Sequence, residues 1–333
     1  MKSILGLLIF LIVLFLYLHI HYHLKVSNDL EVYDMLDEPC KEKLEEMCEY
    51  RQPVRMNMRN DELMNILEMN NLTNTYSAFD VNIRNVKRTV NDDEQLHVPV
   101  RLEHALRVIR NDKDAKYILE CNSDFLSETG IQKTYRNTDA LLRPYMLAGC
   151  KYDYLVGSQG AQTPFRYDIH FRNYIYVVSG TVRIKLSSPK NSKYLELNKD
   201  YEHFEFRTPI NPWNVQDIYK RNFDKVKCLE VELTKGQLLF IPAYWWNSLE
   251  FGENTVISTF KYDSYMSYVA TCHNYLINFL QLQNIKRDSN LKIKQSDNIN
   301  DEIHSHDSGK QDDSIKQDDR DKQYDSIEQE ESS

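Results

Sequence analysis

Glycine and proline are scarce in this chain of 333 residues, which contains nine of each. The chain as a whole is therefore not of low complexity. None of its six cysteines forms a CxxC pair, so neither a zinc knuckle nor a thioredoxin motif is expected. No glycine-rich phosphate loop, HExxH segment, Ser-His-Asp pattern or Cys-His pattern is visible either. The sequence thus lacks the short signatures of several large enzyme classes.

The chain also lacks an excess of positive charge. Its formal net charge is −9, and residues 287–333, with 7 Lys or Arg and 14 Asp or Glu, carry −7 of it. The preceding residues carry only −2, so no basic field for nucleic acid exists and no nucleic-acid partner is expected. Residues 286–333 are polar, acidic and repetitive. They are predicted to form a disordered acidic tail because they cannot bury enough apolar surface, and a partner-binding segment is the alternative.

The remaining composition suits a packed core, with 41% hydrophobic residues and 38 aromatic ones. Cys40 and Cys48 are eight residues apart. On one continuous helix they would be separated by about 12 Å of rise, too far for a disulfide. Buried core thiols are the preferred interpretation of Cys40 and Cys48. Pairing with other cysteines stays open if the domain lies in an oxidising compartment.

An apolar run of seventeen residues extends from Ile4 to Ile20 and contains no Asp, Glu, Lys or Arg. As a helix it would be about 26 Å long, close to the thickness of a hydrocarbon core, and interfacial Tyr and His residues extend it. A cleaved signal peptide is the alternative. Its apolar part would be shorter and followed by a small-residue cleavage site, which is not visible before Lys25. Residues 1–27 are therefore predicted to be an uncleaved single-pass anchor, with a slight preference for a cytosolic N-terminus.

Residues 28–94 are predicted to form a helical N-terminal region. Residues 28–50 are expected to be helical with a break at Pro39. A second short helix is predicted from Asp61 to Met69, capped by Asn60 or Asp61. Asn71-Leu72-Thr73 fits an N-glycosylation acceptor, which matters only if the domain is luminal.

Residues 95–285 begin with a predicted helix from Val98 to Arg110, and after residue 150 short strands predominate. The segment from Tyr174 to Leu186 alternates, with Val182, Ile184 and Leu186 on one face and charged residues on the other. Gln237–Pro242 is predicted to be a buried strand that stops at its proline. Residues 263–285 return to helical spacing. This pattern predicts a mainly β domain with flanking helices.

Two separated segments carry a resemblance to a known family: Thr163-Pro164-Phe165-Arg166-Tyr167-Asp168 and Ile241-Pro242-Ala243-Tyr244-Trp245-Trp246-Asn247. Together with the strand between them they resemble the core of the JmjC/cupin-like Fe(II)/2-oxoglutarate dioxygenases, in which the motifs read TPxHxD, VSGxKRxxL and PxxWWH. The resemblance covers roughly residues 95–275. It implies a double-stranded β-helix, which is a jelly-roll, cupin-like barrel.

The resemblance places iron-ligand positions at Arg166, Asp168 and Asn247. A guanidinium has no available lone pair for a metal, and an Asn amide offers only a weak oxygen ligand. Asp168 alone is too few ligands for iron. Fe(II) and 2-oxoglutarate are therefore expected as cofactors only if an atypical site is active, for which His170 is a possible substitute ligand because it shares a strand face with Asp168.

The co-substrate positions implied by the resemblance are Thr163, Asn173 and Val182. The family's 2-oxoglutarate Lys falls at Val182, Thr163 is retained, and Asn173 matches only if one extra residue is allowed before it. Trp245 and Trp246 correspond to residues that pack the barrel wall.

Arg166 and Asp168 are two residues apart, so their side chains are expected on one face of an extended strand. A buried ion pair between them could fill the volume that the metal leaves. The alternative is that Arg166 binds an anionic ligand in the barrel mouth.

The sequence therefore predicts a membrane-anchored, JmjC/cupin-like protein that is catalytically inactive and works as a binding or scaffolding module with a protein partner. Two alternatives remain open. One is an active protein hydroxylase or demethylase with an atypical metal site, and the other is a structural membrane or virion component.

Overall fold

The computed structural model describes residues 2–35, 39–87, 97–201 and 204–283. The chain divides into two compact units, Met1–Tyr275 and Leu276–Ser333. Of the second unit only residues 276–283 are described, and they are helical. The predicted acidic tail lies outside the described residues. The helices α1 to α8 and the strands β1 to β15 belong to the first unit.

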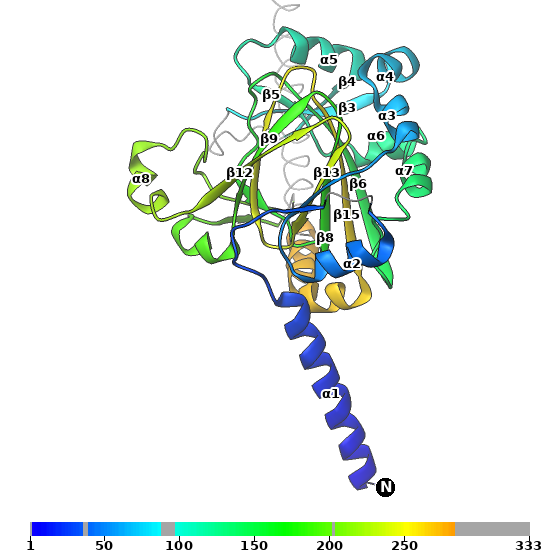
Figure 1. Ribbon diagram of the computed structural model, residues 1–333, viewed down its shortest axis with the longest axis vertical. Coiled ribbons are helices and arrows are strands. Elements are labelled where there is room, and N and C mark those ends of the chain that lie inside the picture. Colours follow the sequence, from blue (N-terminus) through cyan, green and yellow to red (C-terminus); the bar gives the residue numbers. More distant parts are fainter. Residues whose placement is uncertain (1, 36–38, 88–96, 202–203, 284–333) are drawn as a thin grey trace, which may run out of the picture. The chain divides into compact units, whose positions relative to one another are not determined.

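The helices of this unit are short apart from the first (Figure 1). They are α1 (Lys2–Leu24), α2 (Lys41–Glu49), α3 (Asp61–Leu67), α4 (Met69–Tyr76), α5 (Leu102–Asn111), α6 (Ser123–Glu128), α7 (Gln132–Thr138) and α8 (Asp217–Phe223), with a 3₁₀ helix at Pro189–Tyr194. Residues 265–275 are also helical.

Nine strands form the larger sheet, in the order β1-β2-β13-β8-β15-β6-β5-β3-β4. They are β1 (Tyr33–Met35), β2 (Val54–Asn57), β3 (Asp80–Asn85), β4 (Val98–Arg101), β5 (Tyr117–Leu119), β6 (Leu147–Gly157), β8 (Arg172–Ser179), β13 (Gln237–Pro242) and β15 (Val256–Ser264). All neighbouring strands pair antiparallel except β1 and β2.

Six strands form the smaller sheet, in the order β10-β11-β7-β14-β9-β12. They are β7 (Arg166–Tyr167), β9 (Thr181–Ser187), β10 (Asn198–Asp200), β11 (Glu205–Arg207), β12 (Cys228–Thr234) and β14 (Trp246–Phe251). Their pairing is antiparallel throughout. Two such sheets facing each other form the predicted cupin-like barrel, and mostly β structure with flanking helices is confirmed.

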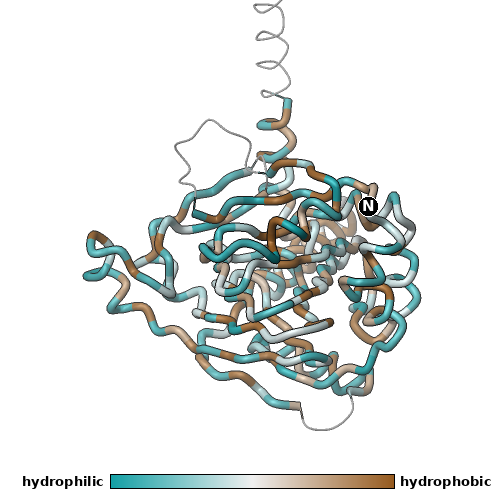
Figure 2. Tube along the Cα trace, turned by 90° about the horizontal axis from the view of Figure 1, so that it is seen from above, coloured by the Kyte–Doolittle hydropathy of each residue, from teal (hydrophilic) through white to brown (hydrophobic). Residues whose placement is uncertain are grey.

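Strand alternation decides what fills the barrel. On β8, Tyr174 and Tyr176 belong to one hydrophobic cluster, whereas Ile175 and Val177 belong to another. The second cluster also contains Val182, so it lies between the sheets. A period of two sends successive side chains to opposite faces, and Figure 2 shows apolar and polar residues alternating along the trace. The larger sheet is therefore apolar on both faces.

Helices cover the outer face of the larger sheet. Buried residues of α2 to α7, such as Leu44, Leu63 and Leu106, share one cluster with the outward-facing side chains of β8 and β13. The short helix predicted near Asp61 is present as α3. Asn60 caps it, because its side-chain oxygen accepts a hydrogen bond from the Leu63 amide at 3.1 Å.

Three local expectations are wrong. Residues 28–50 are not one broken helix, because Tyr33–Met35 pairs with β2 and only Lys41–Glu49 is helical. Residues 28–94 are not simply a helical region, since β2 and β3 add strands to the larger sheet. The helix predicted at Val98 starts four residues later, after β4. In each case pairing with a strand distant in sequence outweighs the local helical pattern.

The cysteines follow their expectation only in part. All six are free thiols, and Cys48 is buried. Cys40, Cys121 and Cys272 are exposed, while the remaining two are half-buried. The interpretation as buried core thiols holds for Cys48 alone.

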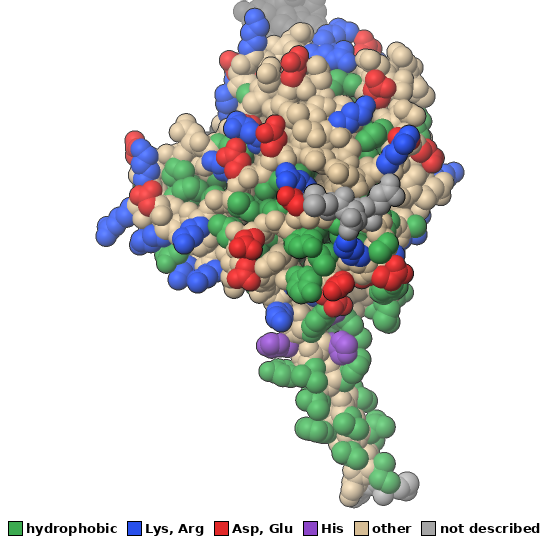
Figure 3. All heavy atoms as spheres, viewed as in Figure 1, with side chains coloured by type: hydrophobic (Ala, Val, Ile, Leu, Met, Phe, Trp, Pro, Cys, Tyr) green, Lys and Arg blue, Asp and Glu red, His purple; other side chains and the backbone are tan. Residues whose placement is uncertain are grey.

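Within the described residues, α1 is the one helix long and apolar enough to cross a membrane, over Ser3–Leu24. Its apolar side chains are exposed along its length, as Figure 3 shows. A helix of this composition near the N-terminus meets the length requirement of a membrane span, and a signal sequence meets the same requirement.

Candidate functional site

The two sequence segments singled out by their motifs meet in the smaller sheet, where the end of the second segment in β14 pairs with the first segment in β7. Strand β7 lies between β11 and β14, and Arg166 is the Cα partner of Asn247 on one side and of Arg207 on the other. Trp246 belongs to a cluster outside the barrel, so strand alternation turns Asn247 and Arg166 inward. The fold therefore brings together the two positions predicted to have lost their histidines.

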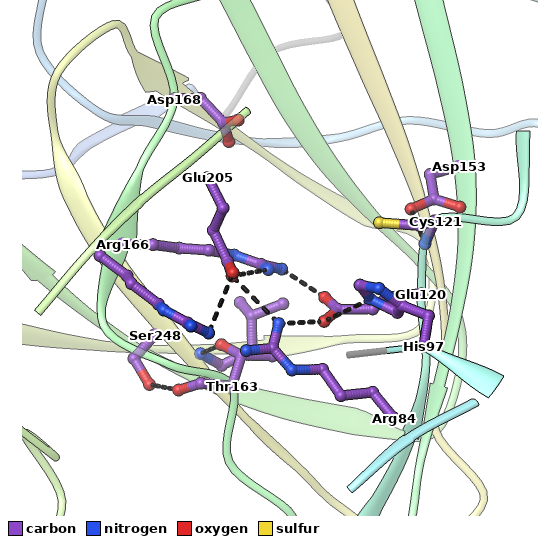
Figure 4. Close-up of polar contacts among 12 residues, drawn as sticks. Arg84, His97, Glu120, Cys121, Asp153, Thr163, Arg166, Asp168, Glu205 and Ser248 are labelled. Atoms are coloured by element: carbon purple, nitrogen blue, oxygen red, sulfur yellow. Dashed lines mark hydrogen bonds and ion pairs between the residues drawn. The ribbon is translucent and has the colours of Figure 1, made fainter. Parts of the chain in front are cut away.

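Arg166 does not point into empty space. Its guanidinium donates to Glu205 through Nη1 at 2.9 Å and to Glu120 through Nη2 at 2.7 Å (Figure 4). Glu205 is on β11 of the smaller sheet, whereas Glu120 follows β5 of the larger sheet. Both carboxylates are buried. Arg166 therefore connects the two sheets across the barrel interior.

Two further arginines complete this ion-pair network. Arg84, on β3, donates to Glu120 at 2.7 Å and to Glu205 at 3.0 Å. Arg207 donates to the second oxygen of Glu205 at 3.1 Å. Three guanidiniums thus surround two carboxylates, and His97 lies 3.5 Å from Glu120. Arg84, Arg207 and the two carboxylates are buried, and Arg166 is half-buried. The network carries a positive balance of one charge when His97 is neutral.

The network fixes the charge of its members. Burial alone raises the pKa of Glu120, but Arg166 and Arg84 bring it well below its usual value. The pKa of Glu205 is lowered against burial by the same two arginines. For Arg166, burial lowers the pKa, and the two carboxylates more than reverse this effect. All three groups are therefore charged at neutral pH.

Asp168 has a partner of its own. Lys261, on β15 of the larger sheet, donates to Asp168 through Nζ at 2.6 Å. Burial raises the pKa of Asp168, but Lys261 and then His170 lower it to about 2. The predicted ion pair between Arg166 and Asp168 is therefore wrong. The two side chains do share a strand face, but each pairs with an oppositely charged residue from another part of the fold.

His170, the possible substitute ligand, is also engaged. Its Nδ1 lies 2.6 Å from Oδ2 of Asp263. Asp263 additionally accepts hydrogen bonds from the Phe171 amide and the Ser267 hydroxyl. Across the described ranges, no three His, Cys, Asp or Glu side chains are grouped so that they could hold a metal ion.

The co-substrate positions are filled by structural contacts. Thr163 is buried, and its hydroxyl oxygen accepts from the Leu249 amide at 2.8 Å. Asn173 is buried and donates to the carbonyls of His170 and Ile241. Val182 is fully buried in the cluster between the sheets, with Ile184 and Leu186. The prediction that Val182, Ile184 and Leu186 share the inner face of this strand is confirmed. An apolar side chain therefore stands at the position where the resembled family has its lysine.

The donor set at these positions does not fit Fe(II). Arg166 brings a cation and Asp168 is neutralised by Lys261, so two positive side chains lie where a dication would need ligands. Asn247 uses its amide nitrogen to donate to the Trp245 carbonyl at 3.3 Å. A non-haem iron site requires neutral imidazoles beside a free carboxylate. No chemical step through iron can be derived from this arrangement.

The two tryptophans pack the barrel wall, as expected. Trp245 is buried between the sheets, whereas Trp246 is buried in a cluster with Phe165 on the other face. The Trp246 indole donates to the Ser192 hydroxyl at 2.8 Å. Neither ring presents a free platform for a sugar or peptide.

Sequence reasoning missed most of the charged partners. Glu120, Glu205, Arg84, Arg207 and Lys261 are far from the motifs in sequence, and their contacts depend on pairing between strands. One signal was available in part: Glu205-Phe206-Arg207 alternates charge with an aromatic residue, and Glu120 directly follows an apolar strand. Charged residues in such positions indicate inward-facing polar groups.

Comparison with known proteins agrees with the cupin-like fold. The cupin-like domain family matches residues 20–268. HSPB1-associated protein 1 of Rattus norvegicus is 32% identical over 96 residues, which is 28% of this chain and 20% of that protein. The protein of the same name from Homo sapiens gives the same identity and coverage. The match thus spans about one fifth of the length of these curated relatives.

Proposed function

This chain belongs to the cupin-like domain family, and from that membership we propose that it is a membrane-anchored protein whose barrel serves as a binding or scaffolding module without iron-dependent oxygenase activity. The observation that carries the proposal is the pairing of Arg166 with Glu120 and Glu205. The side chain at the first histidine position is held by two buried carboxylates, and each of them would lose one ion pair if Arg166 moved aside.

The second support is the region of Asp168. The remaining carboxylate of the motif is paired with Lys261, and the lysine position of the co-substrate site is the buried Val182. Binding of 2-oxoglutarate needs both a metal and a cation for its distal carboxylate. The residues at these positions supply neither.

The anchor part of the proposal rests on α1. Its exposed apolar surface has no cover from the barrel, and a lipid bilayer provides one. We also propose that the barrel binds a protein partner, without naming that partner. The curated relatives are named for association with another protein, which is compatible with a protein-binding role.

The test uses the full chain, purified in a neutral detergent. Thermal unfolding is followed without additions, with Mn(II), and with Mn(II) plus 2-oxoglutarate. A ligand at about one hundred times its Kd stabilises a protein by about 2.7 kcal/mol, which shifts the Tm by several degrees. We expect no shift with either addition. A shift with 2-oxoglutarate that disappears in Asp168→Asn would instead indicate an active site of atypical composition.

A further inference from the structure

A cavity of about 470 Å³ lies where the C-terminal end of α1 meets the barrel. It is separate from the motif positions described above. Four parts of the chain line it: the last turns of α1, the end of α2 with Arg51, residues 144–146, and the barrel residues Phe171, Arg172 and 264–266. None of the residues in the ion-pair network takes part.

Arg51 is the central charge of this cavity. Its side chain is 5% exposed, and its Nη2 has no hydrogen-bond partner. Its guanidinium lies over the rings of Phe171, at 4.8 Å, and of Tyr22, at 5.2 Å. Within the described part of the chain no carboxylate pairs with it. A buried cation without a counterion is unfavourable, so this position suits an anion.

Arg172 lies beside it and supplies a second donor. Its side chain is 4% exposed, and both of its terminal nitrogens donate to Glu45. Its Nε is buried and has no hydrogen-bond partner. Burial lowers the pKa of Arg51, and the charge of Arg172 lowers it further, so the two cations disfavour each other in the absence of an anion.

Neither of the two glutamates that line the cavity forms an ion pair with Arg51. Glu45 is already shared between Arg172 and Lys41. Glu49 is exposed on the last turn of α2, and no ion pair joins it to Arg51. His23, from α1, adds a buried Nδ1 that also has no hydrogen-bond partner. Three residues that line the cavity, Arg51, Arg172 and His23, thus each have a buried nitrogen without a hydrogen-bond partner.

The rim of the cavity is apolar and exposed. Tyr145, Met146 and Tyr265 are 62%, 71% and 60% exposed, and Leu18 and Tyr22 of α1 continue this lining. Tyrosine side chains beside the end of a membrane helix are typical of the membrane–water interface. A ligand with an anionic group and an apolar tail would match both the arginines inside the cavity and the apolar side chains at its rim.

We propose that this cavity binds the phosphate-bearing headgroup of an anionic phospholipid, with Arg51 and Arg172 contacting phosphate oxygens and the apolar rim contacting the acyl chains. The proposal rests on the proposed function in one respect, that α1 is retained as a membrane anchor. It is independent of whether the barrel binds iron or a protein partner.

The test uses the full chain in a neutral detergent and three probes: dioctanoyl phosphatidic acid, dioctanoyl phosphatidylcholine and inorganic phosphate. Thermal unfolding and native mass spectrometry report binding. We expect phosphatidic acid to raise the Tm and remain bound in one copy, with the other probes at least tenfold weaker. In Arg51→Met the affinity for phosphatidic acid should fall about tenfold or more, the size expected for a charge-assisted hydrogen bond.

Arg59→Met is the matched control, because it removes the same charge from a side chain that is 87% exposed. Should Arg51→Met fail to fold, Glu49→Gln gives an independent readout: it removes an exposed negative charge at the cavity and should tighten binding severalfold. Equal binding of inorganic phosphate would overturn the lipid assignment in favour of a soluble phosphate site. Absence of any shift, or a shift kept by Arg51→Met, would overturn the site itself.

A second experiment separates the lipid site from the membrane anchor. Carbonate extraction of membranes tests α1 directly, because a retained membrane helix stays in the pellet. A chain found in the pellet that binds no phosphatidic acid would contradict the lipid site and leave the anchor intact. A chain found in the supernatant would contradict the anchor.

Discussion

Arg166 and Asn247 are cross-strand partners in the antiparallel pair of β7 and β14. They occupy the two positions at which the motifs of the resembled dioxygenases have histidine, and the fold still brings them together. What differs is the chemistry of the side chains. The guanidinium of Arg166 is neutralised by Glu120 and Glu205, which come from two different sheets.

Removing Arg166 should destabilise the protein strongly. In Arg166→Met, the buried Glu120 keeps Arg84, but Glu120 and Glu205 both lose one ion pair. Breaking a buried ion pair from one side costs about 3–5 kcal/mol, and the lower end applies because 22% of the Arg166 side chain is exposed. Denaturant unfolding measures the change. Arg59→Met, at an exposed site, should change stability by less than about 0.5 kcal/mol. Equal effects of the two substitutions would contradict the structural role of the network.

Stability should fall on acidification. Glu120, Glu205 and Asp168 have lower pKa values in the folded chain than in the unfolded chain. The unfolded chain therefore binds more protons at low pH, and the stabilisation present above the unfolded pKa values is lost below them. For Asp168 this loss runs from about pH 3.8 to about pH 2. Asp153 is half-buried, and burial raises its pKa, so this one group acts in the opposite sense to the three.

Tm values between pH 7 and pH 3 check this prediction. The decrease should be smaller in Arg166→Met, because its carboxylates lose the main cause of their lowered pKa values. A Tm that is constant down to pH 3 in the unchanged protein would show that the network contributes no pH-dependent stability.

Returning both histidines should create a metal site. In the double variant Arg166→His and Asn247→His, two imidazoles would stand on paired strands, with Asp168 two residues along β7 from the first. Lys261→Met is added to this double variant so that the carboxylate of Asp168 is free. We expect the combined variant to bind about one Co(II) per chain, seen by its visible absorption and by metal analysis. Each single histidine variant is the control and should bind much less. No binding in the combined variant would mean that the three positions do not converge on one point.

The orientation of the anchor can be read from Asn71. Its side chain is exposed at α4, within the acceptor triplet Asn71-Leu72-Thr73. With the N-terminus on the cytosolic side, the barrel faces the lumen and Asn71 should carry a glycan when expressed in a eukaryotic secretory pathway. Glycosidase treatment should then increase mobility on a gel, and Asn71→Gln should abolish the change. An unshifted band would place the barrel on the cytosolic side.

The barrel could be predicted from the sequence because its signals are local or carried by motifs. Alternation around Val182, the strand that stops at Pro242 and the capped helix after Asn60 are each read within a few residues. That Arg166 and Asn247 belong to one site followed from the resemblance. These features depend on strand period and turn chemistry, which a sequence expresses directly.

The partners of the charged residues could not be predicted in the same way. Asp168 lies two residues from Arg166, so local reasoning paired them, but Lys261 and Glu120 are 93 and 46 residues away from their respective partners. Which distant charge faces an inward position depends on the register between the two sheets. The same applies to β1, whose short segment pairs with β2 in the fold although its sequence suggested a helix.

The most direct test of the central claim is the metal content of the full chain, purified anaerobically in the presence of Fe(II) and analysed per mole of protein, with Asp168→Ala as the reference. The account predicts the same near-zero iron in both proteins, because Arg166 and Lys261 occupy the ligand region with positive charge. About one iron per chain in the unchanged protein, lost in Asp168→Ala, would contradict it and show that the barrel is an iron site after all.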